Sequence, residues 1–432
     1  MIQKIKNIFL HLPKSIFYNF YYGFPSKRLT LIGITGTDGK TTTCTLIYEI
    51  LKNSGINAGL ITTIGAKFGD QQIDTGLHMT SPDPSLIQKI FKKMADSGVT
   101  HVVCEVTAHA LDQYRFYGYQ FDVGAIINTS HEHLDYFSSL DQYIKSKAKI
   151  FNQSKFAILN KDDPSYKIIK PDIKTDFTEF SINEKSNYQA KDIQLTSKFL
   201  KFVVNKLEII TDSNYFYQIY NILTALAVIE HLKIDPKNLI ETVKNFPQTK
   251  GRREEIPNDF GFKTIIDFAH TPNALKNTLS SLRETNNTGK IITIFGATGG
   301  RDQSKRPQMG EIASQISDIT IITADDTRNE KIEDINQQII NGIDSTKTTF
   351  IENLDISQIK KAIKNNSNKH VYFNIYNRQD AFNLAVQLAQ PKDIIIACGK
   401  GHETTILHGN TEYPWSEAEA FRTAFRIKDS TN

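Results

Sequence analysis

From Leu29 onward, hydrophobic residues form short runs rich in β-branched side chains, and each run precedes a longer segment with apolar positions three or four residues apart. Such alternation is typical of parallel strands connected by helices. Strands are predicted for the runs LTLIGIT, AGLITTIG, HVVCEVT, VGAIINT and FAILN, and helices for the segments after Thr41 and from Ser85, Ser139 and Tyr220. We therefore expect an α/β fold, with a P-loop domain built on a mostly parallel sheet over residues 29–247.

The same alternation resumes near Gly251. Strands are predicted for KTIIDFA, KIITIFG, ITIITAD, KTTFIEN, HVYFNIY and DIIIACG, and helices for MGEIASQIS and ISQIKKAIKN. This pattern predicts a second, Rossmann-like domain over residues 248–432. Between Tyr166 and Phe216, polar and apolar residues alternate instead, which predicts an antiparallel edge or meander inside the first domain.

Residues 1–28 are basic, aromatic and apolar, but Pro13, Lys14 and Asn19 interrupt the apolar positions. A membrane-spanning helix needs about 20 mostly apolar residues in succession, and a secretory signal needs a small-residue cleavage site. The segment has neither, so we expect an amphipathic N-terminal extension packed on the first domain. Contact of residues 1–25 with a membrane surface is the alternative.

Composition excludes several classes of protein. With 39% hydrophobic and 23% charged residues, the chain fits a globular protein rather than a disordered one or a coiled coil. The net charge of +4 is spread without a long basic block, so no nucleic-acid partner is expected. Cys44, Cys104 and Cys398 are far apart and lie in apolar runs, which predicts buried free thiols in a reducing compartment, and therefore a cytoplasmic protein. We expect a monomer.

The stretch GITGTDGKTTT, residues 33–43, connects a predicted strand to a predicted helix. Backbone N–H groups of a glycine-rich turn and of a helix N-terminus bind phosphate. In such a loop Lys40 would neutralise the β- and γ-phosphates, and the hydroxyl of Thr41 would hold Mg²⁺. We therefore predict that ATP, or alternatively GTP, binds with magnesium. The predicted contacts are Gly36, Thr37, Asp38, Gly39, Lys40, Thr41 and Thr42.

Two other polar groups follow predicted strands. Glu105 ends HVVCEV, where a carboxylate beside a phosphate loop suits a magnesium ligand, and capping of the helix at Ala108 is the alternative role. The loop NTSHEHLD, residues 128–135, follows VGAIINT. It has no cysteine and no HExxH pattern, so its oxygen-rich composition with an imidazole favours magnesium over zinc.

Lys147 in YIKSKAKIF, taken alone, indicates a solvated helix face. However, this motif and GTDGKTTT, EVTAHALDQYR, NTSHEHLDYF, YNILTALA, GRREE, DFAHTPNAL, GGRDQSKRP and GKGHE occur in the order and approximate spacing of the Mur ligases. The chain resembles that family from residue 29 to about 419. Within the family, it is most similar to the branch that adds the third residue to UDP-N-acetylmuramoyl-L-Ala-D-Glu in peptidoglycan precursor synthesis.

The resemblance implies an ATP-dependent ligase that phosphorylates a substrate carboxylate to an acyl phosphate, which an amine then attacks to form an amide. It implies two magnesium ions, the first held by Thr41 and Glu105 and the second by His133. It also implies that Lys147 is carbamylated by CO2, which turns an ammonium into an anion at the metal site. Further nucleotide contacts are implied for Asn128, Asn221 at the adenine, Arg252 at the γ-phosphate, Asp267 at the ribose and His270 at the phosphates.

The substrate residues are also implied by the resemblance. The muramoyl dipeptide would contact Thr80, Ser81, Thr107, Gln113 and Arg115. The incoming amino acid would contact Arg301, Asp325, Asp326, Arg328, Gly399 and Glu403. Family members that use meso-diaminopimelate carry Asp-Asn-Pro-Arg where this chain has Asp-Asp-Thr-Arg. The arginine that would pair with the distal carboxylate is kept, so we favour meso-diaminopimelate over L-lysine.

Some features depart from the family. Only residues 1–28 precede the first predicted strand, so the usual N-terminal domain that binds the uridine diphosphate is not expected. A ligase with another acceptor, of the folylpolyglutamate or polyamino-acid type, is therefore the alternative function. Asp38 replaces the usual asparagine and places a carboxylate beside phosphate. A nucleotide-binding protein without catalysis is the third hypothesis, and the full catalytic set argues against it. That set is Lys40, Glu105, His133, Lys147, Arg252 and His270.

Overall fold

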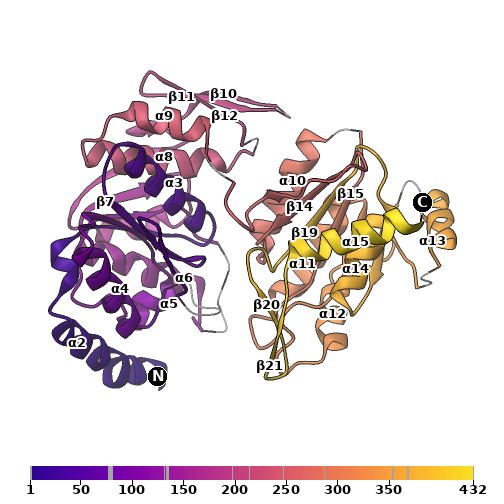
Figure 1. Cartoon of the computed structure of the whole chain (residues 1–432), viewed down its shortest axis with the longest axis horizontal. Coiled ribbons are helices and arrows are strands. Elements are labelled where there is room, and N and C mark those ends of the chain that lie inside the picture. The colour runs from indigo at the N-terminus through magenta and orange to yellow at the C-terminus, as the bar shows by residue number, and fades with distance from the viewer. Residues whose placement is uncertain are drawn as a thin grey trace. The chain divides into compact units, whose positions relative to one another are not determined.

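The computed structural model describes residues 2–75, 81–130, 132, 136–196, 198–213, 215–246, 248–286, 288–352, 355–366 and 369–431. The chain forms two units, Met1–Phe246 and Pro247–Asn432 (Figure 1). Each unit has its own sheet and its own buried apolar clusters.

A nine-stranded sheet with the order β4-β3-β2-β5-β1-β6-β7-β8-β9 organises the first unit. Its strands pair in parallel, except that β2, β3 and β4 form an antiparallel meander at one edge. The strands are β1 (Thr30–Thr35), β2 (Ala58–Thr62), β3 (Gly65–Phe68), β4 (Gln71–Ile73), β5 (His101–Glu105), β6 (Phe121–Ile126), β7 (Ser154–Asn160), β8 (Asp176–Ser181) and β9 (Tyr188–Gln189).

Helices lie between these strands or after them, and the spacing of apolar residues predicts those that begin at Lys40, Pro84, Leu140 and Gln218. They are α3 (Lys40–Asn53), α4 (Pro84–Asp96), α5 (Ala108–Asp112), α6 (Leu140–Ala148), α7 (Tyr166–Ile169), α8 (Gln218–His231) and α9 (Pro236–Lys244). Before the sheet come α1 (Ile2–Lys6), a π-helical turn (Asn7–His11) and α2 (Leu12–Tyr21). Short 3₁₀ turns cover Pro25–Arg28, Lys149–Gln153 and Lys170–Asp172.

The alternating region before α8 is only partly antiparallel. Strands β10 (Lys191–Leu195), β11 (Leu200–Val204) and β12 (Leu207–Thr211) form a separate antiparallel sheet. Strands β8 and β9 instead extend the main sheet in parallel, so the prediction of a meander was wrong for them. Strand β8 lies near the edge of the sheet, where Asp176 and Phe177 are exposed while Thr178 and Phe180 are buried. Such a mixture of polar and apolar residues resembles the sequence of an antiparallel edge strand.

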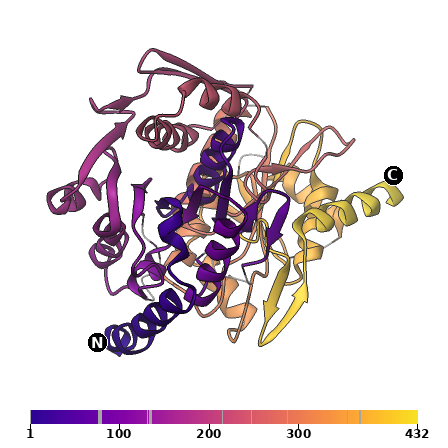
Figure 2. The same ribbon diagram turned by 60° about the vertical axis from the view of Figure 1, so that its left-hand side comes forward.

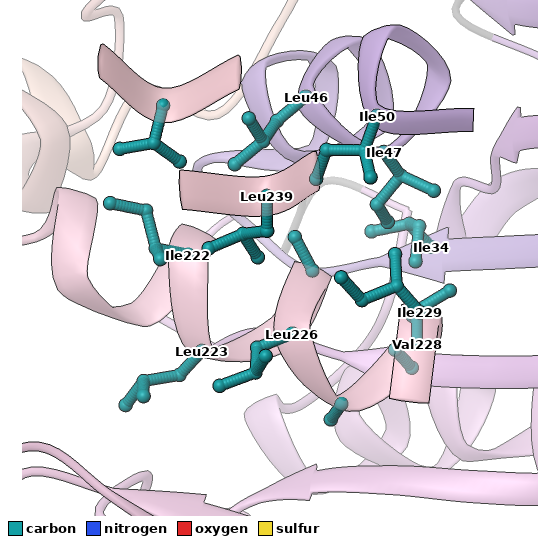
Figure 3. Packing of buried hydrophobic residues seen from close by; sticks show 14 of the residues in the cluster. Ile34, Leu46, Ile47, Ile50, Ile222, Leu223, Leu226, Val228, Ile229 and Leu239 are labelled. Atoms are coloured by element: carbon teal, nitrogen blue, oxygen red, sulfur yellow. The ribbon is translucent and has the colours of Figure 1, made fainter. Parts of the chain in front are cut away.

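Helices α3 and α8 pack together on one face of the first sheet (Figure 3). Ile34 of β1, Leu46 and Ile50 of α3, and Ile222 and Ile229 of α8 are fully buried in this cluster. Burying one such side chain contributes roughly 1.5–3 kcal/mol. The helix that follows the glycine-rich loop is therefore held to the sheet over its length, which fixes the position of the loop.

The second unit is a doubly wound domain on a seven-stranded sheet with the order β13-β14-β19-β15-β16-β18-β17, parallel except for β13. Its strands are β13 (Glu254–Glu255), β14 (Lys263–Asp267), β15 (Ile291–Phe295), β16 (Ile319–Ile322), β17 (Thr348–Phe350), β18 (His370–Asn374) and β19 (Ile394–Cys398). Its helices are α10 (Pro272–Thr285), α11 (Lys305–Ile316), α12 (Ile332–Ile340), α13 (Ile356–Asn365), α14 (Arg378–Leu388) and α15 (Glu417–Thr431). A hairpin of β20 (Thr405–His408) and β21 (Thr411–Pro414) precedes α15. The predicted α/β fold is confirmed.

The three cysteines are buried free thiols, as their apolar sequence context predicts. Cys44 lies on α3, Cys104 on β5 and Cys398 on β19. Burial raises the pKa of each thiol above its usual value. Within the described parts of the chain, no helix combines the length and the hydropathy required to cross a bilayer.

Candidate active site

The glycine-rich loop lies between the end of β1 and the first residue of α3. Gly39 precedes the helix with a φ of +80°, a left-handed conformation that suits glycine. In the described structure no side chain of the N-cap residue caps α3. The N–H groups of the first turn of a helix have no hydrogen-bond partner within the helix. This is the arrangement in which a helix N-terminus binds an anion.

Asn128, which follows β6, sets the shape of this loop. Its Oδ1 accepts hydrogen bonds from the backbone N–H groups of Thr37 at 3.0 Å and Asp38 at 2.9 Å. Its Nδ2 donates to the carbonyl of Asp38 at 3.1 Å. Asn128, which the sequence predicts for the site, therefore fixes the backbone of the loop through its side-chain amide.

Glu105 ends β5, the strand that pairs with β1, and is 2% exposed. Its Oε2 accepts from the hydroxyls of Thr41 at 2.9 Å and Thr63 at 3.2 Å, and the Nζ of Lys40 lies 4.0 Å from its Oε1. Glu105 does not cap α5, because Thr107 does so by accepting from the N–H of Ala110. The carboxylate therefore faces the phosphate loop.

Lys147 lies on the buried side of α6, with 2% of its surface exposed, so a solvated position is excluded. Its Nζ donates to the carbonyl of Gly36 at 2.6 Å and lies 4.5 Å from the centroid of the Tyr143 ring. Burial, and to a smaller extent the charge of Lys40, lowers the pKa of Lys147 to about 7. Lys147 thus combines an amine that is partly neutral near pH 7 with a position against the phosphate loop.

Four of the predicted acceptor residues form one cluster. The hydroxyl of Ser81 donates to the carbonyl of Glu105 at 3.2 Å and accepts from the N–H of Thr107 at 3.1 Å. Arg115 donates to the carbonyl of Ser81, and its Nε donates to Oε1 of Gln113 at 3.0 Å. The cluster is therefore joined directly to the strand that carries Glu105. Thr80 and His133, also predicted for the site, lie outside the described residues.

In the second unit, Arg252, Asp267 and His270 surround Phe268. The guanidinium of Arg252 lies 4.2 Å from the Phe268 ring centroid, and Nδ1 of His270 is 2.8 Å from the Phe268 carbonyl oxygen. The Asp267 carboxylate ends β14 and accepts from the N–H of Ala269 at 2.9 Å. The three predicted residues are therefore neighbours at the carboxyl end of one strand, where open α/β sheets bind ligands.

The predicted residues Asp325, Asp326, Gly399 and Glu403 gather around Lys400. Lys400 is fully buried, and its Nζ lies 2.7 Å from Oδ1 of Asp326 and 2.5 Å from Oε2 of Glu403. Burial opposes its charge, but Asp325, Glu403 and Asp326 outweigh that effect and raise the pKa of Lys400. Gly399 has a φ of +109°, which strains any other residue, and a Cβ there would lie 2.7 Å from Oδ2 of Asp325.

Arg328 extends from the same loop in a left-handed conformation, with a φ of +50°. The hairpin fixes its backbone, because Arg328 donates to the carbonyl of Leu407 at 3.3 Å and accepts from the N–H of Gly409 at 2.8 Å. Its guanidinium forms no ion pair with any residue in the described ranges. Arg301 follows Gly300, which lies beside the Arg328 side chain. A cationic group is therefore placed next to the Asp325 and Asp326 cluster.

Comparison with known proteins identifies the family. The model of the Mur ligase middle domain matches residues 34–229, and that of the Mur ligase, glutamate ligase domain matches residues 251–401. A UDP-N-acetylmuramoyl-L-alanyl-D-glutamate–2,6-diaminopimelate ligase of Caldanaerobacter subterraneus subsp. tengcongensis is 34% identical over 404 residues, covering 92% of this chain and 78% of that protein. The chain belongs to the Mur ligase family.

Solved structures agree with this Mur ligase fold. A structure of UDP-N-acetylmuramoyl-L-alanyl-D-glutamate–2,6-diaminopimelate ligase superposes with a TM-score of 0.63 at 24% identity, covering 96% of this chain and 83% of the other. Folylpolyglutamate synthase of Mycobacterium tuberculosis, complexed with ADP and AMPPCP, has a TM-score of 0.66 at 15% identity, with coverage of 90% and 92%. Both likenesses concern the fold, and neither discriminates between acceptors.

As a member of this family, the Mur ligase is an ATP-dependent acid–amino-acid ligase. Its first unit fits magnesium ATP, because the Thr41 hydroxyl and the Glu105 carboxylate are hard oxygen donors in contact beside the phosphate loop. No three His, Cys, Asp or Glu side chains gather as a metal cluster within the described ranges, from which His133 is missing.

Three residues of the Mur ligase site were not predicted from sequence. The hydroxyl of Thr63 donates to Glu105. Thr63 follows a strand without a motif, so its sequence context does not indicate a functional residue. Tyr143 lies four residues before Lys147, so a helical projection of α6 would have placed the two together. Lys400 stands inside the motif GKGHE, where a charge within an apolar and glycine-rich stretch signals burial with a partner.

Proposed function

We propose that this Mur ligase adds a diamino acid, meso-diaminopimelate rather than L-lysine, to a UDP-N-acetylmuramoyl-L-Ala-D-Glu-type acceptor in peptidoglycan precursor synthesis. One observation carries the proposal: the acceptor cluster is joined to the nucleotide site, through the hydrogen bond from Ser81 to the carbonyl of Glu105. A carboxylate held by Arg115 and its neighbours then lies close to the phosphate loop. The substrates in the name of the Caldanaerobacter relative agree with this assignment.

The proposed reaction begins with transfer of the γ-phosphoryl group from ATP to an oxygen of the acceptor carboxylate, which forms an acyl phosphate and releases ADP. Lys40 would neutralise the phosphates, Thr41 and Glu105 would hold one magnesium ion, and His133 would hold another. Bound magnesium supplies positive charge that screens the repulsion between carboxylate and triphosphate. The amine of the incoming residue then attacks the acyl phosphate and displaces inorganic phosphate, forming an amide. Asn221, Arg252, Asp267 and His270 are proposed to contact the nucleotide.

We infer that Lys147 acts as a carbamate. Its neutral amine attacks the carbon of CO2, a nitrogen–carbon bond forms, and one proton leaves to solvent. Burial and the lowered pKa support this step, because the neutral amine is the nucleophilic form. The resulting anion suits a position beside Lys40 and the bound cation far better than an ammonium does.

The choice of meso-diaminopimelate over L-lysine rests on Arg328. A planar guanidinium pairs with a carboxylate through two parallel hydrogen bonds, and meso-diaminopimelate has a distal carboxylate that L-lysine lacks. Because Arg328 has no ion pair with a described residue, its charge is available for that group. Asp325, Asp326 and Glu403 are proposed to bind the amino groups, with Lys400 balancing their charge.

Release of ADP tests this function. Purified protein is incubated with Mg²⁺, ATP, bicarbonate and UDP-N-acetylmuramoyl-L-Ala-D-Glu, and then with meso-diaminopimelate, L-lysine or no amino acid. We expect ADP release that requires meso-diaminopimelate, together with a tripeptide product in mass spectrometry, and no release by Lys40→Ala. Release with L-lysine alone would correct the amino acid. Release with pteroyl glutamate and glutamate, but not with the muramoyl acceptor, would overturn the proposal.

A further inference from the structure

The N-terminal helices α1 and α2 are packed on the first unit through their polar side. Asn7 and Asn19 are each 3% exposed. Nδ2 of Asn7 donates to Oδ2 of Asp112 at 2.7 Å, and Nδ2 of Asn19 donates to the carbonyl of Tyr117 at 2.7 Å. Burying a side-chain amide costs free energy unless the amide is hydrogen-bonded. These contacts therefore determine which side of the helices faces the first unit.

The opposite side of the helices is apolar and exposed. Phe9 is 77% exposed, Phe20 70% and Tyr21 69%. Other exposed apolar side chains of this segment are Ile5, Ile8, Leu10 and Phe17. An ordinary surface helix buries its apolar stripe and exposes its polar one, and here the order is reversed. The helices lie at the periphery of the first unit (Figures 1 and 2), and these apolar side chains are exposed there.

The charge of the segment limits what can cover this face. Residues 1–28 contain four lysines and one arginine, and no aspartate or glutamate. Lys14 and Arg28 form exposed ion pairs with Asp83 and Asp96, and Lys6 is exposed beside the apolar stripe. The segment itself is therefore purely cationic, which complements an anionic surface.

The aromatic residues of α2 point to a lipid interface. Phe17, Tyr18, Tyr21 and Tyr22 form neighbouring ring contacts along the helix. Tyrosine has an apolar ring and a polar hydroxyl, and it concentrates where lipid head groups meet acyl chains. Helices with basic residues beside an apolar aromatic face lie in the plane of such interfaces.

We propose that residues 2–21 form an interfacial anchor that binds the surface of an anionic lipid bilayer, with the apolar face toward the acyl chains. The anchor holds the acceptor side of the first unit near the membrane, because its contacts include Asp112, which precedes Gln113, and Asp83, which follows Ser81 by two residues. This goes beyond the proposed ligase reaction and stands independently of it.

Co-sedimentation with vesicles tests the anchor. Full-length protein is mixed with vesicles of phosphatidylcholine alone or of phosphatidylcholine with phosphatidylglycerol. We expect binding to the anionic vesicles that weakens with added salt, and a bound fraction at least about five-fold lower for Phe9→Glu and Phe20→Glu. The matched control is Phe350→Glu, which changes an exposed phenylalanine of the second unit and should bind as the unchanged protein does.

Other results would overturn the anchor. One is that no protein sediments with anionic vesicles at low salt; another is that Phe350→Glu weakens binding as much as Phe9→Glu. Sedimentation velocity without vesicles tests a second copy as the occupant: a dimer that Phe9→Glu dissociates, without vesicle binding, contradicts the proposal. Near-ultraviolet circular dichroism checks that each variant is folded, and failure of the ligase assay has no bearing on the result.

Discussion

At the scale of single residues, burial determines what a lysine can do. Lys145 and Lys147 are two residues apart on α6, yet Lys145 is exposed and Lys147 is buried against the phosphate loop. Removing water from an ammonium favours its neutral form and lowers its pKa. The two lysines therefore have the same sequence context and different chemistry.

Substitution of Lys147 tests its role. We expect Lys147→Ala to lower kcat by at least about 100-fold, since general electrostatic groups of this kind contribute several kcal/mol, and added short carboxylates should restore part of the activity. Because the folded pKa is about 7, the neutral amine predominates above pH 7. Bicarbonate-dependent activity should therefore rise as the pH rises through 7. Lys145→Ala is the control, and equal activity of both variants would contradict the assignment.

Arg328 carries a prediction about substrate choice. Replacement by alanine removes the guanidinium proposed for the distal carboxylate, so we expect the KM for meso-diaminopimelate to rise at least about ten-fold, as loss of a charged hydrogen bond does. Steady-state kinetics with varied amino acid measure this. Arg426→Ala changes an exposed arginine of α15 and should leave the KM unchanged; an unchanged KM for Arg328→Ala would remove the argument for diaminopimelate.

At the scale of elements, the approach of α8 to the start of α3 determines which residue can precede α3. Asn221 on α8 is buried, and Thr43 of α3 donates to its Oδ1 at 3.1 Å. A Cβ on Gly39 would lie only 2.5 Å from that same oxygen. Glycine is therefore needed at the loop both for its conformation and for space.

A pair of glycine variants separates these two reasons. Gly39 and Gly55 have φ values of +80° and +76°, but nothing lies within 4 Å of a Cβ on Gly55. Both alanine variants carry the backbone strain, about 1 kcal/mol, and only Gly39→Ala forces Asn221 away. We expect Gly39→Ala to weaken nucleotide binding at least about ten-fold in calorimetric titration. Similar binding by both variants would show that the close approach is unimportant.

Local patterns predicted most elements of the fold, and contacts between distant residues explain what they missed. Strands such as β1 and β19 are continuous apolar runs, and the phosphate loop is a local motif, so both could be found from sequence. The reversed orientation of α1 and α2 could not, because it depends on Asn7 meeting Asp112, 105 positions away. The hydrogen bond between Asn128 and Asp38 of the phosphate loop could not be predicted either, because the two residues are 90 positions apart.

At the scale of the whole molecule, the two units have separate hydrophobic cores. The clusters around Ile34 and Phe91 belong to the first unit, and those around Ile294 and Phe295 to the second. Units with independent cores unfold as separate cooperative domains. We therefore expect each unit to have its own free energy of unfolding.

Differential scanning calorimetry tests this division. We expect two transitions, of which Leu226→Ala on α8 lowers one and Phe382→Ala on α14 lowers the other, since both side chains are fully buried. Truncations of this kind destabilise by about 2–5 kcal/mol. A single transition that both variants shift equally would show that the units unfold together.

The buried cysteines provide built-in reporters of that unfolding. Reaction with an alkylating reagent requires an accessible thiolate, and the burial that shields each sulfur also raises its pKa. Labelling under native conditions therefore proceeds only as fast as the surrounding structure opens. Because Cys44 and Cys104 lie in the first unit and Cys398 in the second, peptide mass spectrometry of alkylated protein gives an opening rate for each half of the enzyme without any engineered probe.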